Sequence, residues 1–141
     1  MKKNTLLTLR SEQIYDGGSN KSKQTAKGTF EKLPDGTYVI EYTEPDAEMG
    51  NSLSRIQVVD CEKIQMDRSG AYTTSLTIEQ GKAHTTPYRT PFGEMELEII
   101  GNKVTTNLSA SGGSIYLDYH IMSNNQLLNK NKLIINIKIT D

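Results

Sequence analysis

The sequence has few of the features that stabilise small secreted domains or anchor proteins in membranes. Its 141 residues include one cysteine, Cys61, so no disulfide can form within the chain. No segment approaches the ~20 apolar residues of a membrane span. The apolar run after Met1 stops at Arg10, short of the roughly 7–15 residues of a secretory signal. We therefore expect a cytoplasmic protein with no membrane partner.

An excess of charge of one sign is also missing. Lysine and arginine number 16 against 17 aspartates and glutamates, which gives a net charge of -1. A nucleic-acid-binding domain normally has a basic excess, so the composition predicts no nucleic-acid partner. The hydrophobic fraction is low at 35%, yet the charged residues are balanced at 23%, which favours a folded chain over a disordered one. The length fits a single domain over residues 1–141.

What the sequence does contain is alternation of apolar and polar residues with period two. In a strand, successive side chains point to opposite faces, so such segments have one apolar and one polar face. No segment of ten or more residues has a convincing period of 3.6, so we expect little or no helix. The alternating segments are residues 38–43, 72–79, 94–99, 115–121 and 133–140, with a shorter one at 7–9.

Turn signals separate these segments at short intervals. Most contain the glycine that positive-φ turn positions favour, and residues 60–62 are expected to reverse the chain without one. A longer polar connection is expected at residues 124–131, and residues 43–52 are interpreted as a loop or a broken strand. The expected glycine turns are 16–18, 34–36, 69–70, 80–82, 101–103 and 111–113.

Evenly spaced short strands joined by hairpin turns indicate an antiparallel meander. A flat meander would leave two exposed edges, and closure into a barrel removes them. The predicted fold is therefore all-β, a single closed up-and-down barrel of about 8–10 strands. A two-sheet sandwich is the alternative, although sandwiches usually need longer crossing connections.

Several segments resemble one known family. Residues 68–71 read Arg-Ser-Gly-Ala, residues 79–82 read Glu-Gln-Gly-Lys, and residues 88–93 match Tyr-x-Thr-Pro-aromatic-Gly, the most specific part. Together they are similar to the YwiB-like family of small bacterial calycin-like barrels, a domain of unknown function, over nearly the whole chain. The resemblance implies a closed, lipocalin-like barrel in a cytoplasmic bacterial protein, and it implies no activity, cofactor or catalytic residue.

A candidate ligand-binding cluster surrounds the most specific segment. His84 and Tyr88 share one strand face, and Arg89 follows directly. Arginine can orient an anionic group through its planar fork of donors. Arg68 continues an inward apolar series, so near a barrel end it must meet water, a carboxylate or a ligand. The alternative is structural: residues 90–93 form a corner that closes the barrel, with Tyr88 packed over it.

Tyrosine is the dominant aromatic residue, with seven copies against two phenylalanines. Tyr42 and Tyr119 share strand faces with aliphatic residues, so their rings should be buried and their hydroxyls paired. If they point into the lumen, the lumen is partly polar and both residues join the candidate site. A barrel of this size can hold one small ligand or be filled by its own side chains, and both alternatives stay open.

Catalytic and metal-binding signatures are absent from the sequence. Cys61 lies between Asp60 and Glu62, which disfavour the reactive thiolate, so we expect a buried or partly buried structural cysteine. His84 and His120 are the only histidines, and neither has the spacing of a zinc site. No Gly-x-Ser-x-Gly elbow occurs. These observations predict a protein that is not an enzyme and needs no cofactor or metal.

The first functional hypothesis is a β-barrel that binds a small, partly apolar ligand in its lumen. An anionic group of that ligand would lie near Arg68, Arg89, His84 and Tyr88. The hypothesis predicts a cavity of at least roughly 300 Å³.

The alternative hypothesis is an interaction or scaffolding barrel that acts through its outer surface or as a homodimer. It predicts an exposed apolar patch on the outside, for example around Ile134, Tyr116 and Met122.

Overall fold

Ten antiparallel strands make up the part of the chain that the structure, a computed structural model, describes: residues 2–46, 50–69, 74–90 and 93–140. Within these ranges there is no helix, and so none long and apolar enough to cross a membrane. The strands are β1 (Lys3–Tyr15), β2 (Gly18–Lys32), β3 (Tyr38–Asp46), β4 (Gly50–Asp60), β5 (Lys63–Ser69), β6 (Thr74–Glu79), β7 (Ala83–Thr90), β8 (Gly93–Ser109), β9 (Gly112–Ser123) and β10 (Gln126–Ile139).

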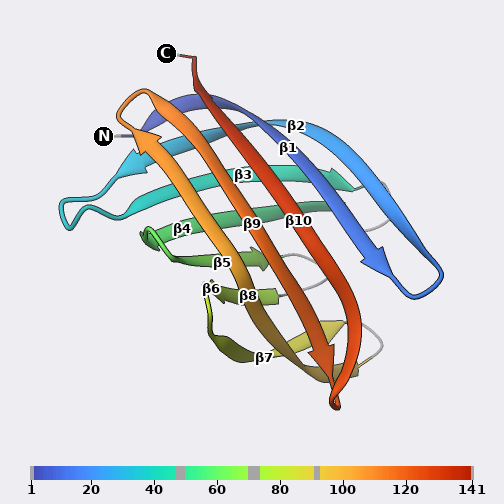
Figure 1. The fold of residues 1–141 in the computed structure, drawn as a ribbon. Helices are drawn as coiled ribbons and strands as arrows, with labels where there is room; N and C mark the ends of the chain where they lie inside the picture. Colours follow the sequence, from blue (N-terminus) through green and yellow to red (C-terminus); the bar gives the residue numbers. More distant parts are fainter. Residues whose placement is uncertain (1, 47–49, 70–73, 91–92, 141) are drawn as a thin grey trace.

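The strands form one sheet in the order β6-β5-β4-β3-β2-β1-β10-β9-β8-β7. Each strand therefore pairs with its neighbours in the chain, except that β6 and β7, as far as the structure describes them, do not pair with each other, and the first and last strands pair from Thr5↔Ile139 to Ile14↔Lys130. Figure 1 shows β1 beside β10, with both termini at the same end of the molecule. The predicted up-and-down barrel is confirmed, and the sandwich alternative is wrong.

The barrel is nearly closed, with a seam between β6 and β7. No strand ladder joins these two strands in the described residues, and separate hydrogen bonds cross the seam instead, such as the one from the Thr86 hydroxyl to the carbonyl of Ser75. The backbone amide of Gly81 donates to the carbonyl of Gly101 (2.9 Å), and the amide of Gly101 donates to Lys82 (3.1 Å). The amide of Val104 also donates to the side-chain oxygen of Gln80 (3.0 Å). The backbone around Gly101 is therefore one of the places where the barrel is held closed.

Two expected connections are wrong. Residues 101–103 are not a turn but an irregularity inside β8, where the register with β9 shifts between Gly101 and Lys103. A bulge bends a long strand and increases its twist, which helps the seventeen-residue β8 to pair with both β7 and β9. The longer connection expected at residues 124–131 is a two-residue hairpin turn, with positive φ at Asn124 (52°) and Asn125 (62°).

The other expected reversals within the described residues are confirmed. The turn at residues 60–62 lacks glycine. The carboxylate of Asp60 accepts a hydrogen bond from the backbone amide of Glu62 (2.8 Å), and this bond stabilises the turn. Residues 43–52 contain the end of β3 and the start of β4, and the turn expected at residues 69–70 falls partly outside the described residues.

The inward faces of the strands build a core at the end of the barrel that holds the termini. Aliphatic side chains dominate it, and the ring of Phe30 stacks on Tyr38 with centroids 5.3 Å apart. Toward the other end, the same inward series continue with small or polar residues such as Ser11, Ser22 and Ser54. The lumen is therefore filled at one end and underfilled at the other. The largest fully buried side chains are Leu7, Ile40, Ile56, Ile64, Ile78, Ile99, Ile115, Leu117 and Ile135.

Candidate functional site

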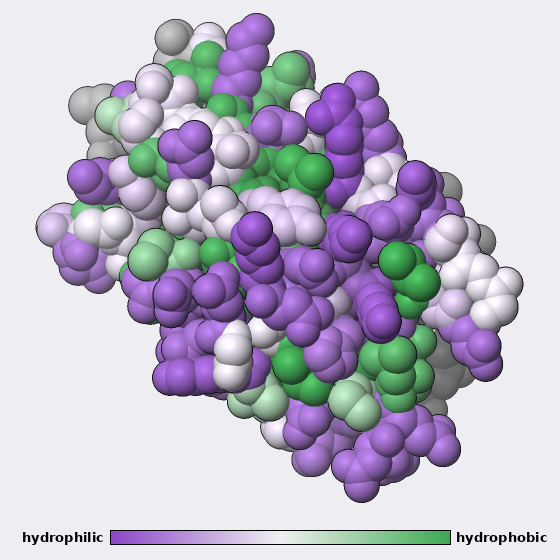
Figure 2. Space-filling view, in the orientation of Figure 1, coloured by the Kyte–Doolittle hydropathy of each residue, from purple (hydrophilic) through white to green (hydrophobic). Residues whose placement is uncertain are grey.

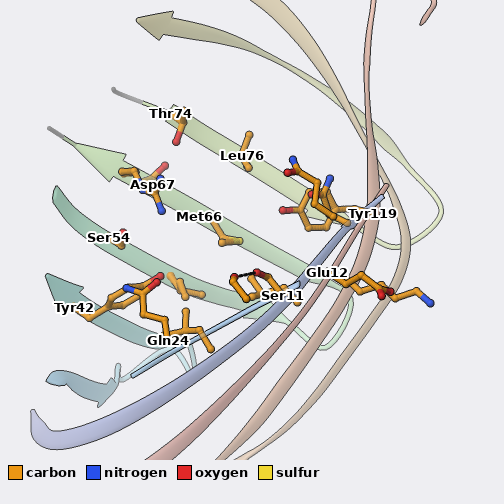
Figure 3. A pocket seen from close by; sticks show the side chains of 18 of the residues that line it. Ser11, Glu12, Gln24, Tyr42, Ser54, Met66, Asp67, Thr74, Leu76 and Tyr119 are labelled. Atoms are coloured by element: carbon orange, nitrogen blue, oxygen red, sulfur yellow. Dashed lines mark hydrogen bonds between the residues drawn. The ribbon is translucent and has the colours of Figure 1, made fainter. Parts of the chain in front are cut away.

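A cavity of about 490 Å³ occupies the underfilled end of the lumen. Figure 3 shows side chains converging on it from several strands. Leu9, Ile56, Met66, Leu76 and Leu133 supply its apolar lining, and serine, glutamine and tyrosine side chains supply the polar part. The volume exceeds the roughly 300 Å³ at which ligand pockets begin.

Four of the six residues predicted from the sequence line this cavity: Arg68, Tyr88, Tyr42 and Tyr119. They come from four strands, β5, β7, β3 and β9, and the barrel brings them together. The backbone of Arg89 lies in β7, but its side chain falls outside what the structure describes. Residues 91–92 of the expected corner also lie outside the described residues.

Tyr119 of β9 and Arg68 of β5 both line the cavity. The Tyr119 side chain is 8% exposed, and burial raises its pKa to about 12, an effect that the positive charge of Arg68 opposes. The phenol is therefore neutral near pH 7 and can donate a hydrogen bond. Arg68 lies near the end of β5 and is exposed, so its guanidinium can meet a group that enters from solvent.

Ser54 is one of several polar residues of the cavity that sequence reasoning missed, and it is the one with an unpaired buried hydroxyl. It is 5% exposed, and its hydroxyl oxygen has no hydrogen-bond partner among the described residues. A buried hydroxyl normally finds a partner, because leaving it unpaired costs free energy. Ser54 pairs in register with Tyr42 on one side and Arg68 on the other, so it stands between two of the predicted site residues.

His84 does not line the cavity, so the structure does not bring it together with the other predicted site residues. Its Nε2 atom lies 2.9 Å from a carboxylate oxygen of Glu79, the last residue of β6. Tyr88 shares its strand face but lies four residues further along β7, about 13 Å away at ~3.3 Å per residue. The His84–Glu79 pair bridges the seam, so His84 has a structural position.

This pair predicts a dependence of stability on pH. The hydrogen bond from His84, assisted by Lys82, lowers the pKa of Glu79 below its ordinary value of 4.5. A lowered carboxyl pKa contributes stability that is present above 4.5 and is lost as the pH falls through the lowered folded-state value. We expect Glu79→Gln to flatten this part of the acid limb in urea denaturation measured between about pH 3 and pH 6.

The matched control is Glu62→Gln, which removes an exposed carboxylate that forms no ion pair with the residues that the structure describes. An acid limb that is the same in Glu79→Gln and the unchanged protein would contradict the prediction.

Cys61 is exposed, so the expectation of a buried or partly buried cysteine is wrong. It lies in the turn between β4 and β5, outside the strand faces that build the core. Across the described ranges, no group of three or more histidine, cysteine, aspartate or glutamate residues is placed to hold a metal ion.

The class of protein that this architecture defines is a small up-and-down β-barrel with a partly polar lumen. A family model, the domain of unknown function DUF1934, matches residues 7–135, and the chain belongs to that family. The expected YwiB-like relationship is confirmed by the crystal structure of the ywiB protein from Bacillus subtilis. That structure matches with a TM-score of 0.87 and 18% identity over 99% of this chain and 94% of the other. At this identity the likeness shows the fold alone. No curated protein matches the chain.

Proposed function

We propose that this protein binds a small, partly apolar molecule in the cavity of its barrel, without catalysing a reaction. The observation that carries the proposal is the unpaired, buried hydroxyl of Ser54 in the wall of a cavity of about 490 Å³. A ligand with a polar group at this position would satisfy that hydroxyl. The apolar lining would cover the rest of the ligand, as is typical of small-molecule sites.

The charges around the cavity favour a ligand with one negative group. Arg68 follows the inward series of β5 into the cavity, whereas Glu12 and Lys132, which also border it, pair in register with each other on the outer face. Arg68 is the cation beside Ser54 in the strand register, and its fork of donors suits a carboxylate or sulfonate. The neutral phenol of Tyr119 supplies a further donor in the wall of the cavity. The charged lining residues are Glu12, Arg55, Asp67, Arg68 and Lys132.

Native mass spectrometry of the protein purified from its own host tests this proposal. We expect a small molecule to be retained in the gas phase and released when the protein unfolds. Anilinonaphthalene sulfonate, an apolar fluorophore with one negative charge, provides a second test, since the released molecule should displace it. A protein that retains no molecule and binds no probe would overturn the proposal.

Replacing Ser54 by alanine separates binding from folding. The change removes a buried hydroxyl without a partner, so we expect the free energy of unfolding to rise by about 1 kcal/mol. The affinity for the native ligand should fall, because a hydrogen bond in the cavity is lost. Urea denaturation and ligand titration measure the two effects.

Thr5→Val is the matched control. Thr5 has the other buried side-chain hydroxyl without a partner in the described part of the chain, and it does not line the cavity. It should gain stability in the same way while ligand affinity stays unchanged. Equal ligand affinity in Ser54→Ala and the unchanged protein would argue against a role for this hydroxyl.

A further inference from the structure

The outer face of the barrel has a second hollow, on the opposite side of β1 from the cavity. It has a volume of about 460 Å³ and lies across β2, β1, β10 and β9. Figure 2 views the molecule from the side of β1, β9 and β10 and shows apolar side chains set among hydrophilic ones. We call this hollow the outer groove; the residues that define it are Arg10, Lys21, Lys23, Lys132, Tyr116 and Ile134.

Strand register arranges the outer groove in two rows. Lys23, Arg10, Ile134 and Tyr116 are consecutive cross-strand partners and form the first row. Lys21, Glu12, Lys132 and Asp118 form the second row, two residues further along the strands, and Asp118 accepts a hydrogen bond from Asn102 (3.2 Å). Four strands at ~4.8 Å spacing span about 14 Å, the length of about four extended residues.

The cations of the outer groove exceed the carboxylates available to them. Glu12 is the only carboxylate that lines it, and it already pairs with Lys21 (3.4 Å). Arg10, Lys23 and Lys132 form no ion pair with any residue that the structure describes. Ile134 lies between these cations and is 38% exposed. Although the net charge of the chain is -1, unpaired positive charges surround the exposed apolar surface of Ile134 in the outer groove.

We propose that the outer groove docks an extended acidic segment of a partner protein that has at least one large apolar side chain. Carboxylates of the segment would meet Lys23, Arg10 and Lys132, and its apolar side chain would cover Ile134 and Tyr116. Opposite charges at the rim and apolar contact at the centre are the common anatomy of protein interfaces.

The lining favours a peptide over single-stranded nucleic acid. Sites for single strands stack successive bases on several aromatic side chains, and the outer groove has only one aromatic residue, Tyr116. Three of its four cations are lysines, which act as point charges and provide no planar surface for stacking.

Fluorescence anisotropy with a labelled peptide tests the proposal. The probe has about eight residues, alternating aspartate and leucine, so that it spans the outer groove with both chemistries. We expect binding that weakens as the salt concentration rises. The double variant Lys23→Gln, Lys132→Gln should bind roughly fivefold more weakly, since exposed charge contacts are individually modest.

The matched control is Lys103→Gln, Lys138→Gln, which removes the same charge from exposed positions outside the outer groove and should leave binding unchanged. The variant Ser54→Trp should also bind the peptide normally, because the proposal does not depend on the cavity. Four outcomes would overturn the proposal: no binding at low salt, equal binding of an asparagine–leucine peptide, tighter binding of a short oligothymidine, or a dimer in sedimentation that the Lys23→Gln, Lys132→Gln variant dissociates.

Discussion

Replacing Gly101 by alanine is expected to lower the free energy of unfolding by roughly 3 kcal/mol, although it adds a single methyl group. A Cβ atom at Gly101 would overlap the backbone carbonyl of Glu79, at the end of β6. A backbone atom cannot move aside as a flexible side chain can. The variant must separate β6 from β8 at the point where the seam is closed, or lose the hydrogen bonds that close it.

Urea denaturation measures the loss, and hydrogen exchange locates it. The amides of Gly81 and Gly101 donate across this region, so their protection should fall more than that of amides in the β1–β10 ladder. Gly18→Ala is the matched control: the nearest atoms to a Cβ there belong to the Tyr15 side chain, at 3.6 Å or more, an ordinary contact. If Gly101→Ala and Gly18→Ala are equally stable, the seam does not depend on a close backbone approach.

The sequence predicts the strands of this barrel well, because inward and outward positions differ in chemistry along most of them. Leu133 to Ile139 alternates with polar residues on all but one outward position, and the inward members are buried or half-buried. The connections are harder. The glycine at 101 and the asparagines at 124 and 125 look alike as turn signals, yet one marks a bulge and the others a tight hairpin. The difference depends on which strands lie beside them, which the local sequence does not contain.

The candidate site could be predicted only in part, for a related reason. Period two shows that Arg68, Tyr42 and Tyr119 face inward, and all three line the cavity. Depth along the barrel axis is set by register between strands, and so His84 was expected at the site although it lies at the seam. Ser54 was missed because a serine in an alternating strand gives no signal of its own. Its significance comes from Tyr42 and Arg68 beside it.

Replacing Ser54 by tryptophan is expected to weaken binding of anilinonaphthalene sulfonate by at least about tenfold, equivalent to about 1.4 kcal/mol. The serine side chain lies in the cavity wall, so an indole at this position would occupy space that the ligand needs. Because the chain has no tryptophan, the new side chain is also a unique fluorescent reporter. Its emission should be shifted to the blue if the indole lies inside the lumen.

Leu53→Trp is the matched control on the same strand, because Leu53 is 47% exposed and points away from the lumen. Its emission should be that of an indole in water, and the probe should bind as in the unchanged protein.

Leu76→Trp provides a second way to fill the cavity if Ser54→Trp does not fold, as judged by circular dichroism. The variant Arg10→Gln, Lys23→Gln, altered at positions of the outer groove that do not line the cavity, should retain probe binding, which excludes adsorption of the sulfonate to the cations of the outer groove. A folded Ser54→Trp with blue-shifted emission and undiminished affinity would mean that the probe binds elsewhere. The cavity would then have no part in recognising it.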